Sequence, residues 1–410
     1  MRRTLYIECG AAETRAAIFR GDEIIGFEFA PARGDEHLPR AADVGDVFLG
    51  RVRTVSKSLN AAFVDIGEAE DGFLQVKKGE GLPVEGASLV VRARRPALGS
   101  KGAVLSAQWK DAVRREEEDA IESRTALRAA PAKLNEARDA ALCVIQARDF
   151  ADFDEIVMND AGAAWLIRAF AAGFGANPKA IEVVDFSFRD LGVDDAIESA
   201  LDREARLAGG ARLVFDETEA MSVVDVDSGA AGAGKASAVN DRVNIAAAKA
   251  LFPELARRAA GGRIIVDFLP PSDAKARAAL LETLAKSAEG VFKGRFGKLS
   301  VDGVFDLTAP RERRSLLERA SEPAAGADWL RLGRRLTLDW RAKATIRALE
   351  QRLRTETSAR LTLLAGAALA SYIAGRPQWR ERLAQRFGAR FDIMADPKLE
   401  ERAFDVAERR

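Results

Sequence analysis

Histidine and cysteine are nearly absent from this chain of 410 residues, which contains one histidine and two cysteines. Cys9 and Cys143 lie far apart and belong to no spaced pair, so the sequence offers neither a disulfide framework nor a cysteine-rich zinc site. His37 lies in the polar stretch 33–37, whose composition is typical of a loop. Histidine-based catalytic triads and zinc held by histidine are therefore poorly supported. The inventory favours carboxylates with Mg²⁺ or Mn²⁺.

Long apolar runs and an excess of either charge are also missing. No apolar stretch is long enough to cross a bilayer, and the run after Met1 is broken at Glu8, which argues against a signal peptide. Together with the few cysteines, this predicts a cytoplasmic protein. Lys plus Arg and Asp plus Glu both total 63, so any nucleic-acid site must be a local patch. Segment 293–354 is the basic candidate, with a solvated helical face as an equal alternative for 340–354.

Two short apolar runs that carry aspartate are the most informative motifs. Residues 223–229 (VVDVDSG) and 264–268 (IIVDF) are typical of buried strands that deliver a carboxylate to the edge of a sheet. A helical pattern at about 243–258 separates them, so we expect parallel strands whose carboxyl ends meet on one rim. Asp225 and Asp267 would then hold a hard cation between them. Strand-ending caps or ion-pair partners are the alternative for either aspartate.

Short strand patterns separated by glycine fill the first hundred residues. Three of them, at 4–7, 14–19 and 23–29, predict a β-meander. Five more between residues 47 and 105 suit a small OB-type barrel.

Alternation in two of the barrel strands places phenylalanine on the outer surface. In 61–66 the aliphatic residues share one face, so Phe63 points the other way, and the same pattern in 72–76 turns Phe73 outward. Two outward rings on adjacent strands form a platform for unpaired bases, with each stack worth roughly 1–3 kcal/mol. Burial of both rings under a neighbouring domain is the alternative.

The remainder of the chain alternates between helical and strand patterns. A charged, helix-prone segment at 108–135 is followed by α/β patterns that include a strand at 141–145, strands at 155–158 and 181–184, helices at 161–174 and 194–207, and a strand at 211–215. A linker containing Pro, Ala and Gly at 320–328 precedes a mostly helical stretch at 336–375. Within it, 361–370 is compatible with either strand or helix.

With these motifs in place, the chain resembles the ribonuclease E/G family over nearly its whole length. Residues 45–52, 59–67 and 72–74 look like the family's S1-type RNA-binding barrel, and 218–229 with 261–268 are similar to its catalytic subdomain. The resemblance implies an α/β multidomain fold: an RNase H-like domain with an inserted S1/OB β-barrel, a DNase I-like catalytic α/β subdomain and a C-terminal small α/β domain. The implied boundaries are 1–37 and 136–200 for the two parts of the RNase H-like domain, 38–107 for the barrel, 108–135 for a charged helical linker that corresponds to a reduced 5′-sensor region, 201–319 for the catalytic subdomain, 320–332 for a linker and 333–410 for the small domain.

The same resemblance implies the roles of individual residues. Asp225 and Asp267 match the metal-binding aspartates, and Lys101 matches the basic residue that accompanies the two phenylalanines in binding RNA. The implied activity is that of a Mg²⁺-dependent endoribonuclease, with Mn²⁺ as a second suitable ion, which cuts single-stranded RNA and leaves 5′-phosphate and 3′-hydroxyl ends. Asp227 is expected to orient the attacking water or a ligand.

The chain also departs from the family pattern. Asp227 stands where Asn is usual, and Ala246 stands where Glu is typical. The family's cysteine pair is missing from 320–332, so no zinc is expected and any homodimer would form without a zinc link. Arg124-Thr125 matches the dipeptide of the 5′ sensor but follows no apolar strand. A non-catalytic RNA-binding protein with the same fold is therefore the alternative function, and a metal-dependent hydrolase of small phosphoesters is a third.

Overall fold

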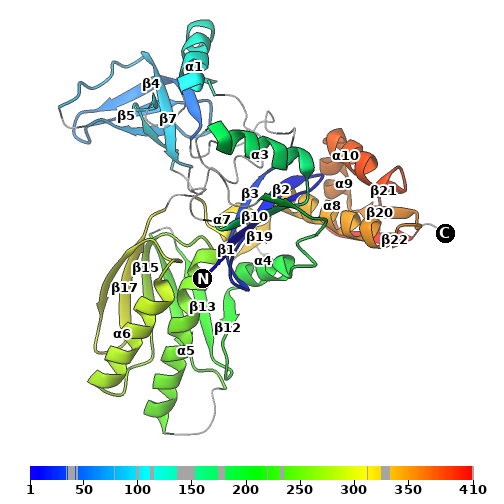
Figure 1. Ribbon diagram of the computed structural model, residues 1–410. Coiled ribbons are helices and arrows are strands. Elements are labelled where there is room, and N and C mark those ends of the chain that lie inside the picture. The colour runs from blue at the N-terminus through cyan, green and yellow to red at the C-terminus, as the bar shows by residue number, and fades with distance from the viewer. Residues whose placement is uncertain are drawn as a thin grey trace.

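The structure is a computed structural model. It describes residues 1–33, 35, 42, 45–77, 79–97, 101–110, 115–135, 153–173, 181–218, 220–230, 235–311, 313–324 and 333–408. Five sheets are present in these residues, with helices packed against them (Figure 1). No helix in the described ranges has the length and apolar character needed to cross a membrane. His37, Cys143 and the strand expected at 141–145 fall outside the described residues.

A five-stranded sheet, which we call the central sheet, joins the N-terminal meander to a later part of the chain. Its strands are β1 (Arg3–Cys9), β2 (Glu13–Arg20), β3 (Glu23–Pro31), β10 (Glu155–Met158) and β11 (Ile181–Val183), in the order β11-β10-β1-β2-β3. The three N-terminal strands are antiparallel, as the meander prediction required, whereas β10 lies parallel to β1 and to β11. Helix α3 (Ala161–Gly173) connects β10 to β11 and packs on one face of the sheet, and α4 (Val193–Leu201) packs on the other.

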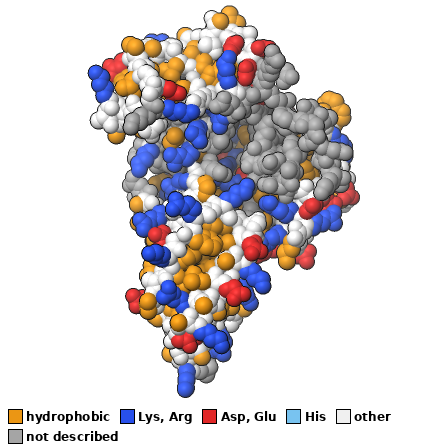
Figure 2. Space-filling view, turned by 60° about the vertical axis from the view of Figure 1, so that its left-hand side comes forward, with side chains coloured by type: hydrophobic (Ala, Val, Ile, Leu, Met, Phe, Trp, Pro, Cys, Tyr) orange, Lys and Arg blue, Asp and Glu red, His pale blue; other side chains and the backbone are white. Residues whose placement is uncertain are grey.

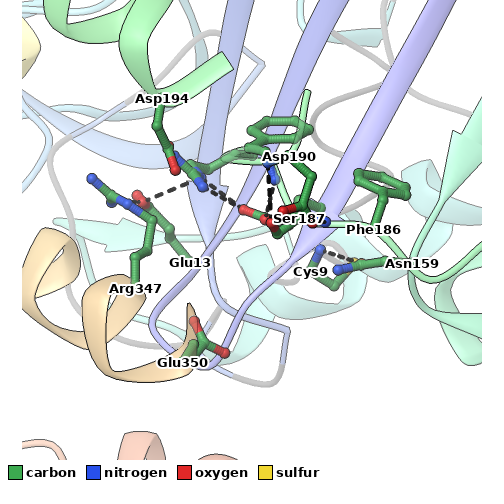
Figure 3. Close-up of polar contacts among 12 residues, drawn as sticks. Cys9, Glu13, Asn159, Phe186, Ser187, Asp190, Asp194, Arg347 and Glu350 are labelled. Atoms are coloured by element: carbon green, nitrogen blue, oxygen red, sulfur yellow. Dashed lines mark hydrogen bonds and ion pairs between the residues drawn. The ribbon is translucent and has the colours of Figure 1, made fainter. Parts of the chain in front are cut away.

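A buried arginine at the middle of this sheet contacts three acidic side chains. Arg15 on β2 is 2% exposed, and its guanidinium pairs with Glu8 on β1 and with Asp194 on α4. Its Nε lies 3.8 Å from Glu13. Glu13 in turn pairs with Arg347 of the C-terminal region, and Figure 3 shows Glu13, Asp194 and Arg347 converging on this point. Charges this deep in a protein persist only when they are paired, so the cluster fixes the elements that carry it.

The second sheet closes into the predicted barrel. Strands β4 (Val47–Ser56), β5 (Ala61–Asp65), β6 (Gly72–Gln75), β7 (Ser88–Arg95) and β8 (Val104–Ser106) follow the order β5-β6-β8-β7-β4, and β4 pairs with β5 to complete the ring. Glycine is required at position 50, where a Cβ would lie 2.4 Å from the Val64 side chain. Helix α1 (Arg115–Leu127) and the short strand β9 (Ala132–Lys133), which pairs with β4, complete this region, seen at the top of Figure 1.

The third sheet carries the two aspartate motifs, and we call it the aspartate sheet. Its strands are β12 (Glu204–Arg206), β13 (Arg212–Glu217), β14 (Met221–Asp227), β15 (Gly262–Asp267), β16 (Arg295–Leu299) and β17 (Val304–Ala309), in the order β12-β13-β14-β15-β17-β16. Helices α5 (Ala236–Arg257) and α6 (Ala274–Ala288) cover one face, where Val224, Val226, Ile264 and Val266 enter an apolar core. As Figure 1 shows, this unit lies below the central sheet, on the side away from the barrel.

Three expectations about these elements need correction. The aspartate strands are not buried on both sides, because α5 and α6 cover a single face and residues 225 and 267 on the other face are exposed. The helix expected at 194–207 ends at Leu201, because 204–206 pairs with β13 as strand β12. The described start of the expected linker is strand β18 (Ser321–Pro323), which pairs with β19 (Arg334–Leu336).

The C-terminal region packs three helices on a small sheet. After α7 (Leu316–Ala320) and the β18–β19 pair come α8 (Leu338–Thr355), β20 (Leu361–Ala365), α9 (Ala367–Ala374), α10 (Pro377–Phe387), β21 (Phe391–Ala395) and β22 (Phe404–Glu408). The sheet order is β21-β20-β22, and α8, α9 and α10 share one apolar core with it. The ambiguous stretch 361–370 is a strand followed by the start of a helix.

Glu350 on α8 joins this region to the turn between β1 and β2. Its Oε1 accepts a hydrogen bond from the backbone N–H of Ala11 at 3.0 Å and lies 3.8 Å from Nη1 of Arg386. The side chain is 14% exposed. Burial raises the pKa of Glu350 to about 7, with the charge of Glu8 acting in the same direction and that of Arg386 opposing it.

Glu350→Gln should therefore stabilise the protein at pH 8. The folded state holds the proton of Glu350 more tightly than the unfolded state does, so stability falls as the pH rises from about 4.5 to about 7. Glutamine keeps an acceptor for Ala11 and removes the buried charge, so we expect a gain of roughly 1–3 kcal/mol at pH 8 and little gain near pH 4. Urea unfolding of both proteins across this range measures the difference. Glu381→Gln, at an exposed position of α10, is the matched control.

Candidate functional site

Asp225 and Asp267 face one another across two neighbouring strands. β14 and β15 run parallel, and their register pairs Val223 with Ile265 and Asp225 with Asp267. Neighbouring strands lie about 4.8 Å apart, and side chains at paired positions leave the sheet on the same side. Both aspartates therefore project from the face that α5 and α6 leave uncovered. The parallel pairing and the juxtaposition of the two carboxylates agree with the sequence prediction.

The two carboxylates form a negatively charged pair. Neither side chain makes a hydrogen bond or ion pair with any residue that the structure describes. Partial burial raises the pKa of Asp225, and the charges of Asp267 and then Asp227 raise it further. Like charges at adjacent strand positions are destabilising unless a cation compensates them. This pair is therefore suited to a divalent cation.

Asp227 is on the same face but is held differently. Its Oδ2 accepts from Nε of Arg212 at 2.9 Å and also from Nη2, and its Oδ1 accepts from the backbone N–H of Gly229 at 2.7 Å. The hydrogen bond from Gly229 lowers the pKa of Asp227, and the bond from Arg212 lowers it further. Asp227 thus differs from Asp225 in having its charge paired within the protein.

The donor set fits a hard ion bound by two carboxylates. Among the described residues, no group of three or more His, Cys, Asp or Glu side chains lies close enough to bind one metal. Mg²⁺ keeps several waters and is commonly bound by one or two carboxylates together with substrate phosphates, so two aspartates on an open face are sufficient. A zinc site would require nitrogen or sulfur ligands, and these do not occur near the pair in the described residues.

A buried amide fixes the chain directly after Asp267. Asn244 on α5 is 2% exposed, and its Nδ2 donates to the carbonyl of Leu269 at 2.7 Å while its Oδ1 accepts from the Leu269 N–H at 3.1 Å. Sequence reasoning did not single out Asn244, and its position within a helical pattern gave no signal of this role. Ala246 lies two residues further along the same helix and is half-buried.

The two phenylalanines of the barrel form a pair on its outer surface. Phe63 on β5 and Phe73 on β6 are register partners, and their ring centroids lie 5.7 Å apart at an interplanar angle of 66°. Both side chains are half-buried, whereas Ala62 and Leu74 beside them point into the barrel core. The alternation predicted from sequence is correct, and part of each ring remains accessible.

Lys101 is exposed and lies at the start of the segment that leads into β8. The following Gly102 packs tightly, because a Cβ there would lie 1.9 Å from the backbone oxygen of Asp71. This contact holds the backbone at Lys101 against the loop that precedes β6, the strand that carries Phe73.

Four arginines line a cleft between strand β3, the C-terminal end of α5 and residues 313–319, and one of them, Arg313, is ion-paired with Glu28. They are Arg257, Arg313, Arg314 and Arg319, with Glu28 as the acidic member of the lining. Arg314 reaches the barrel, since its Nε donates to the carbonyl of Ala97 at 3.3 Å. Burial lowers the pKa of Arg313 to about 10, and the neighbouring charge of Arg319 acts in the same direction. Figure 2 shows Lys and Arg side chains at mid-height on one face, above the tapering lower end of the molecule.

The arginines of α8, part of the expected basic patch, are used within the protein. Arg347 pairs with Glu13, Arg354 Nη1 lies 2.9 Å from Asp185, and Arg341 donates to the carbonyl of Arg402 at 3.0 Å. Both expectations for this helix, a nucleic-acid patch and a solvated face, are therefore wrong for these three arginines, which bind other parts of the protein. By contrast, Arg295 and Lys298 on edge strand β16 are exposed.

The segment after the barrel forms a packed helix. Arg124 Nη1 donates to the carbonyl of Leu134 at 2.8 Å, and Thr125 Oγ1 donates to the carbonyl of Ile121 at 2.8 Å. Arg128 likewise donates to the carbonyl of Lys133 at 2.6 Å. In the described part of this segment, Arg124 and Arg128 therefore fasten α1 to β9 and the residue after it, whereas the Thr125 bond lies within α1.

These features define a mixed α/β protein in which a closed OB-type barrel is joined to a sheet bearing two adjacent aspartates. The sequence model of the ribonuclease E/G family matches residues 76–312, more than half of the chain. The chain belongs to the ribonuclease E/G family.

Individual relatives match shorter parts. Ribonuclease G of Haemophilus influenzae is 33% identical over 131 residues, which cover 32% of this chain and 27% of the relative. The chloroplastic ribonuclease E/G-like protein of Arabidopsis thaliana is 30% identical over 137 residues, covering 32% and 14%. Ribonuclease E of Escherichia coli is 23% identical over 358 residues, covering 66% and 33%. The match thus spans a third or less of the length of these relatives.

Phe63→Ala and Phe73→Ala should weaken RNA binding and leave the barrel folded. Each substitution removes one aromatic face from the outer surface, so we expect a loss of roughly 1–3 kcal/mol in binding an unstructured RNA. Fluorescence polarisation measures the affinity, and thermal unfolding measures the stability. Val64→Ala, on the core side of the same strand, is the comparison, because it should lower stability instead. Aggregation of the phenylalanine variants would instead assign both rings to the core.

Proposed function

We propose that this protein is a Mg²⁺-dependent endoribonuclease that cleaves single-stranded RNA and leaves 5′-phosphate and 3′-hydroxyl ends. The observation that carries the proposal is the register pairing of Asp225 with Asp267 on an open sheet face, without any cation paired to either carboxylate in the described residues. Family membership supports a role in RNA processing, because the matched relatives are named as ribonucleases. The end chemistry comes from the resemblance alone, whereas the choice of a hard ion is also supported by the two-carboxylate donor set.

Each part of the proposed site has a distinct task. A divalent cation held by Asp225 and Asp267 would supply Lewis-acid polarisation of the scissile phosphate and a more acidic water, and Mn²⁺ could replace Mg²⁺. The phenylalanine pair would stack unpaired bases, and Lys101 would neutralise backbone phosphate beside it. Such a site would recognise the sugar-phosphate backbone and the flexibility of the RNA, not a particular base sequence.

We propose that each sheet corresponds to one domain of the family fold. The central sheet corresponds to the RNase H-like domain, the closed barrel to the inserted S1 domain, and the aspartate sheet with α5 and α6 to the DNase I-like subdomain. The region from β19 onward corresponds to the small C-terminal domain. Segment 320–332 contains no cysteine, so we also propose that the protein binds no zinc and that any homodimer rests on side-chain packing. A cytoplasmic location belongs to the same proposal.

RNA binding without catalysis is the second candidate function. It is favoured by the small ligand set, since no third carboxylate joins Asp225 and Asp267 in the described residues and Ala246 offers none from α5. Incubation of the purified protein with a fluorescent unstructured RNA, with Mg²⁺ and with a chelator, separates the two functions. Binding without any Mg²⁺-dependent cleavage would favour this second candidate.

Asp225→Asn and Asp267→Asn should each abolish cleavage and leave RNA affinity within a few-fold. The amide keeps the shape of the side chain but removes the charge that would bind the ion. Gel analysis of the fluorescent RNA gives cleavage, and fluorescence polarisation gives affinity. Asp306→Asn is the matched control on the same face, because Asp306 is paired with Arg263 at 3.2 Å, and it should cleave normally. Wild-type cleavage by both aspartate variants would contradict the metal assignment.

Cleavage should not depend on the 5′ end of the RNA. A pocket for a terminal phosphate needs free Arg or backbone donors, whereas Arg124 and Arg128 donate to backbone carbonyls and Glu117, Glu118 and Asp119 repel phosphate nearby. Initial rates on one oligonucleotide bearing a 5′-monophosphate, triphosphate or hydroxyl should agree within a few-fold. A preference for monophosphate of about tenfold, or about 1.4 kcal/mol, would show that a sensor exists.

A further inference from the structure

Arg212 occupies a specific place beside the aspartate pair. It is the register partner of Asp227, so strand β13 presents it on the open face directly across from that carboxylate. Its Nε and Nη2 both donate to Oδ2 of Asp227, and its Nη1 donates to Glu204 at 3.2 Å. The guanidinium is thereby held between carboxylates from two strands.

Three hydrogen bonds from within the protein occupy most of the acceptor positions of the Asp227 carboxylate, and its charge is paired with Arg212. Oδ2 is taken by Arg212, and Oδ1 is taken by the backbone N–H of Gly229. Gly229 has a φ of +51°, and a Cβ there would lie 2.3 Å from the backbone oxygen of Gly210, so the turn that supplies this N–H is itself packed in place. Without these contacts, Asp227 would be a third carboxylate on the same strand face as Asp225, two residues away.

We propose that Arg212 is a positioning residue of the Asp225–Asp267 site: by pairing with Asp227 it limits the carboxylates available to the divalent cation to two. The inference rests on the proposed function and refines it. With Arg212 in place, Asp227 and Arg212 together carry no net charge, and the two remaining carboxylates match the charge of a divalent ion. Without Arg212, an unpaired third negative charge would lie on the same strand face, two residues from Asp225.

The ion pair between Arg212 and Asp227 is too exposed to contribute much to stability. The side chains of Arg212 and Asp227 are 42% and 32% exposed, and ion pairs this accessible contribute little to stability. Loss of Arg212 should therefore leave the sheet folded, while a third charge beside the ion should change its affinity. If Arg212 only stabilised the fold, its replacement would leave the affinity for the ion unchanged, so ion binding without RNA distinguishes the two roles.

The experiment measures Mn²⁺ affinity of the full chain by electron paramagnetic resonance in the absence of RNA. We expect Arg212→Gln to bind Mn²⁺ more tightly than wild type by a factor of about five or more, because it removes a positive charge and releases a negative one. The double variant Arg212→Gln with Asp227→Asn should return to within about twofold of wild type, since a neutral pair replaces a neutral pair. Arg212→Lys keeps the charge and should also stay near wild type.

Arg203→Gln is the matched control. Arg203 pairs with Asp216 on the same strand as Arg212, and its charge also reaches Asp225, so its loss reports the effect of removing a positive charge without releasing Asp227. We expect a change of less than about twofold.

Two results would overturn the inference. One is an equal effect of Arg212→Gln and Arg203→Gln, and the other is a double variant that binds Mn²⁺ as tightly as Arg212→Gln alone. Failure of the proposed function gives a different result, in which Asp225→Asn leaves the Mn²⁺ affinity of the otherwise wild-type chain unchanged. Circular dichroism of each variant verifies that the sheet is folded.

Discussion

One buried guanidinium connects the parts of this molecule that are most distant in sequence. Arg15 binds acidic groups from β1 and α4, and through Glu13 it reaches Arg347 on α8. Because an unpaired charge at this depth would cost several kcal/mol, removal of any one partner from this cluster should destabilise the packing of these elements. The central sheet has an apolar core on each face, and the Arg15 cluster fixes how its strands, α4 and α8 sit against one another.

The aspartate sheet gains its chemistry from having one covered face and one open face. α5 and α6 supply an apolar core beneath the strands, which fixes the register of β14 against β15. That register then determines which side chains meet on the open side, so Asp225 meets Asp267 while Asp227 meets Arg212 from β13. The same strand pairing therefore determines which side chains enter the apolar core and which charged side chains meet on the open face.

Much of this arrangement follows from local sequence, and the remainder follows from pairing between segments. The β-branched runs before Asp225 and Asp267, with a helix between them, were sufficient to predict parallel neighbours, and alternation alone turned Phe63 outward. The Arg212–Asp227 pair could not be predicted, because it depends on the register of two antiparallel strands joined by a turn. Strand β12 was wrongly predicted as helix for the same reason, since 204–206 has helical propensity but gains its hydrogen bonds from β13.

The contact made by Asn244 links the Asp225–Asp267 pair to the interior of the protein. Its side-chain amide pairs with both backbone groups of Leu269, as a neighbouring strand would, and it is rooted in helix α5 beside the fully buried Ala247 and Leu251. Because Asn244 is bonded to Leu269, a shift of α5 that repacks this core would also move the backbone two residues beyond Asp267. Under the proposed function, the cleavage rate should therefore respond to small packing changes in this core that leave the melting temperature almost unchanged.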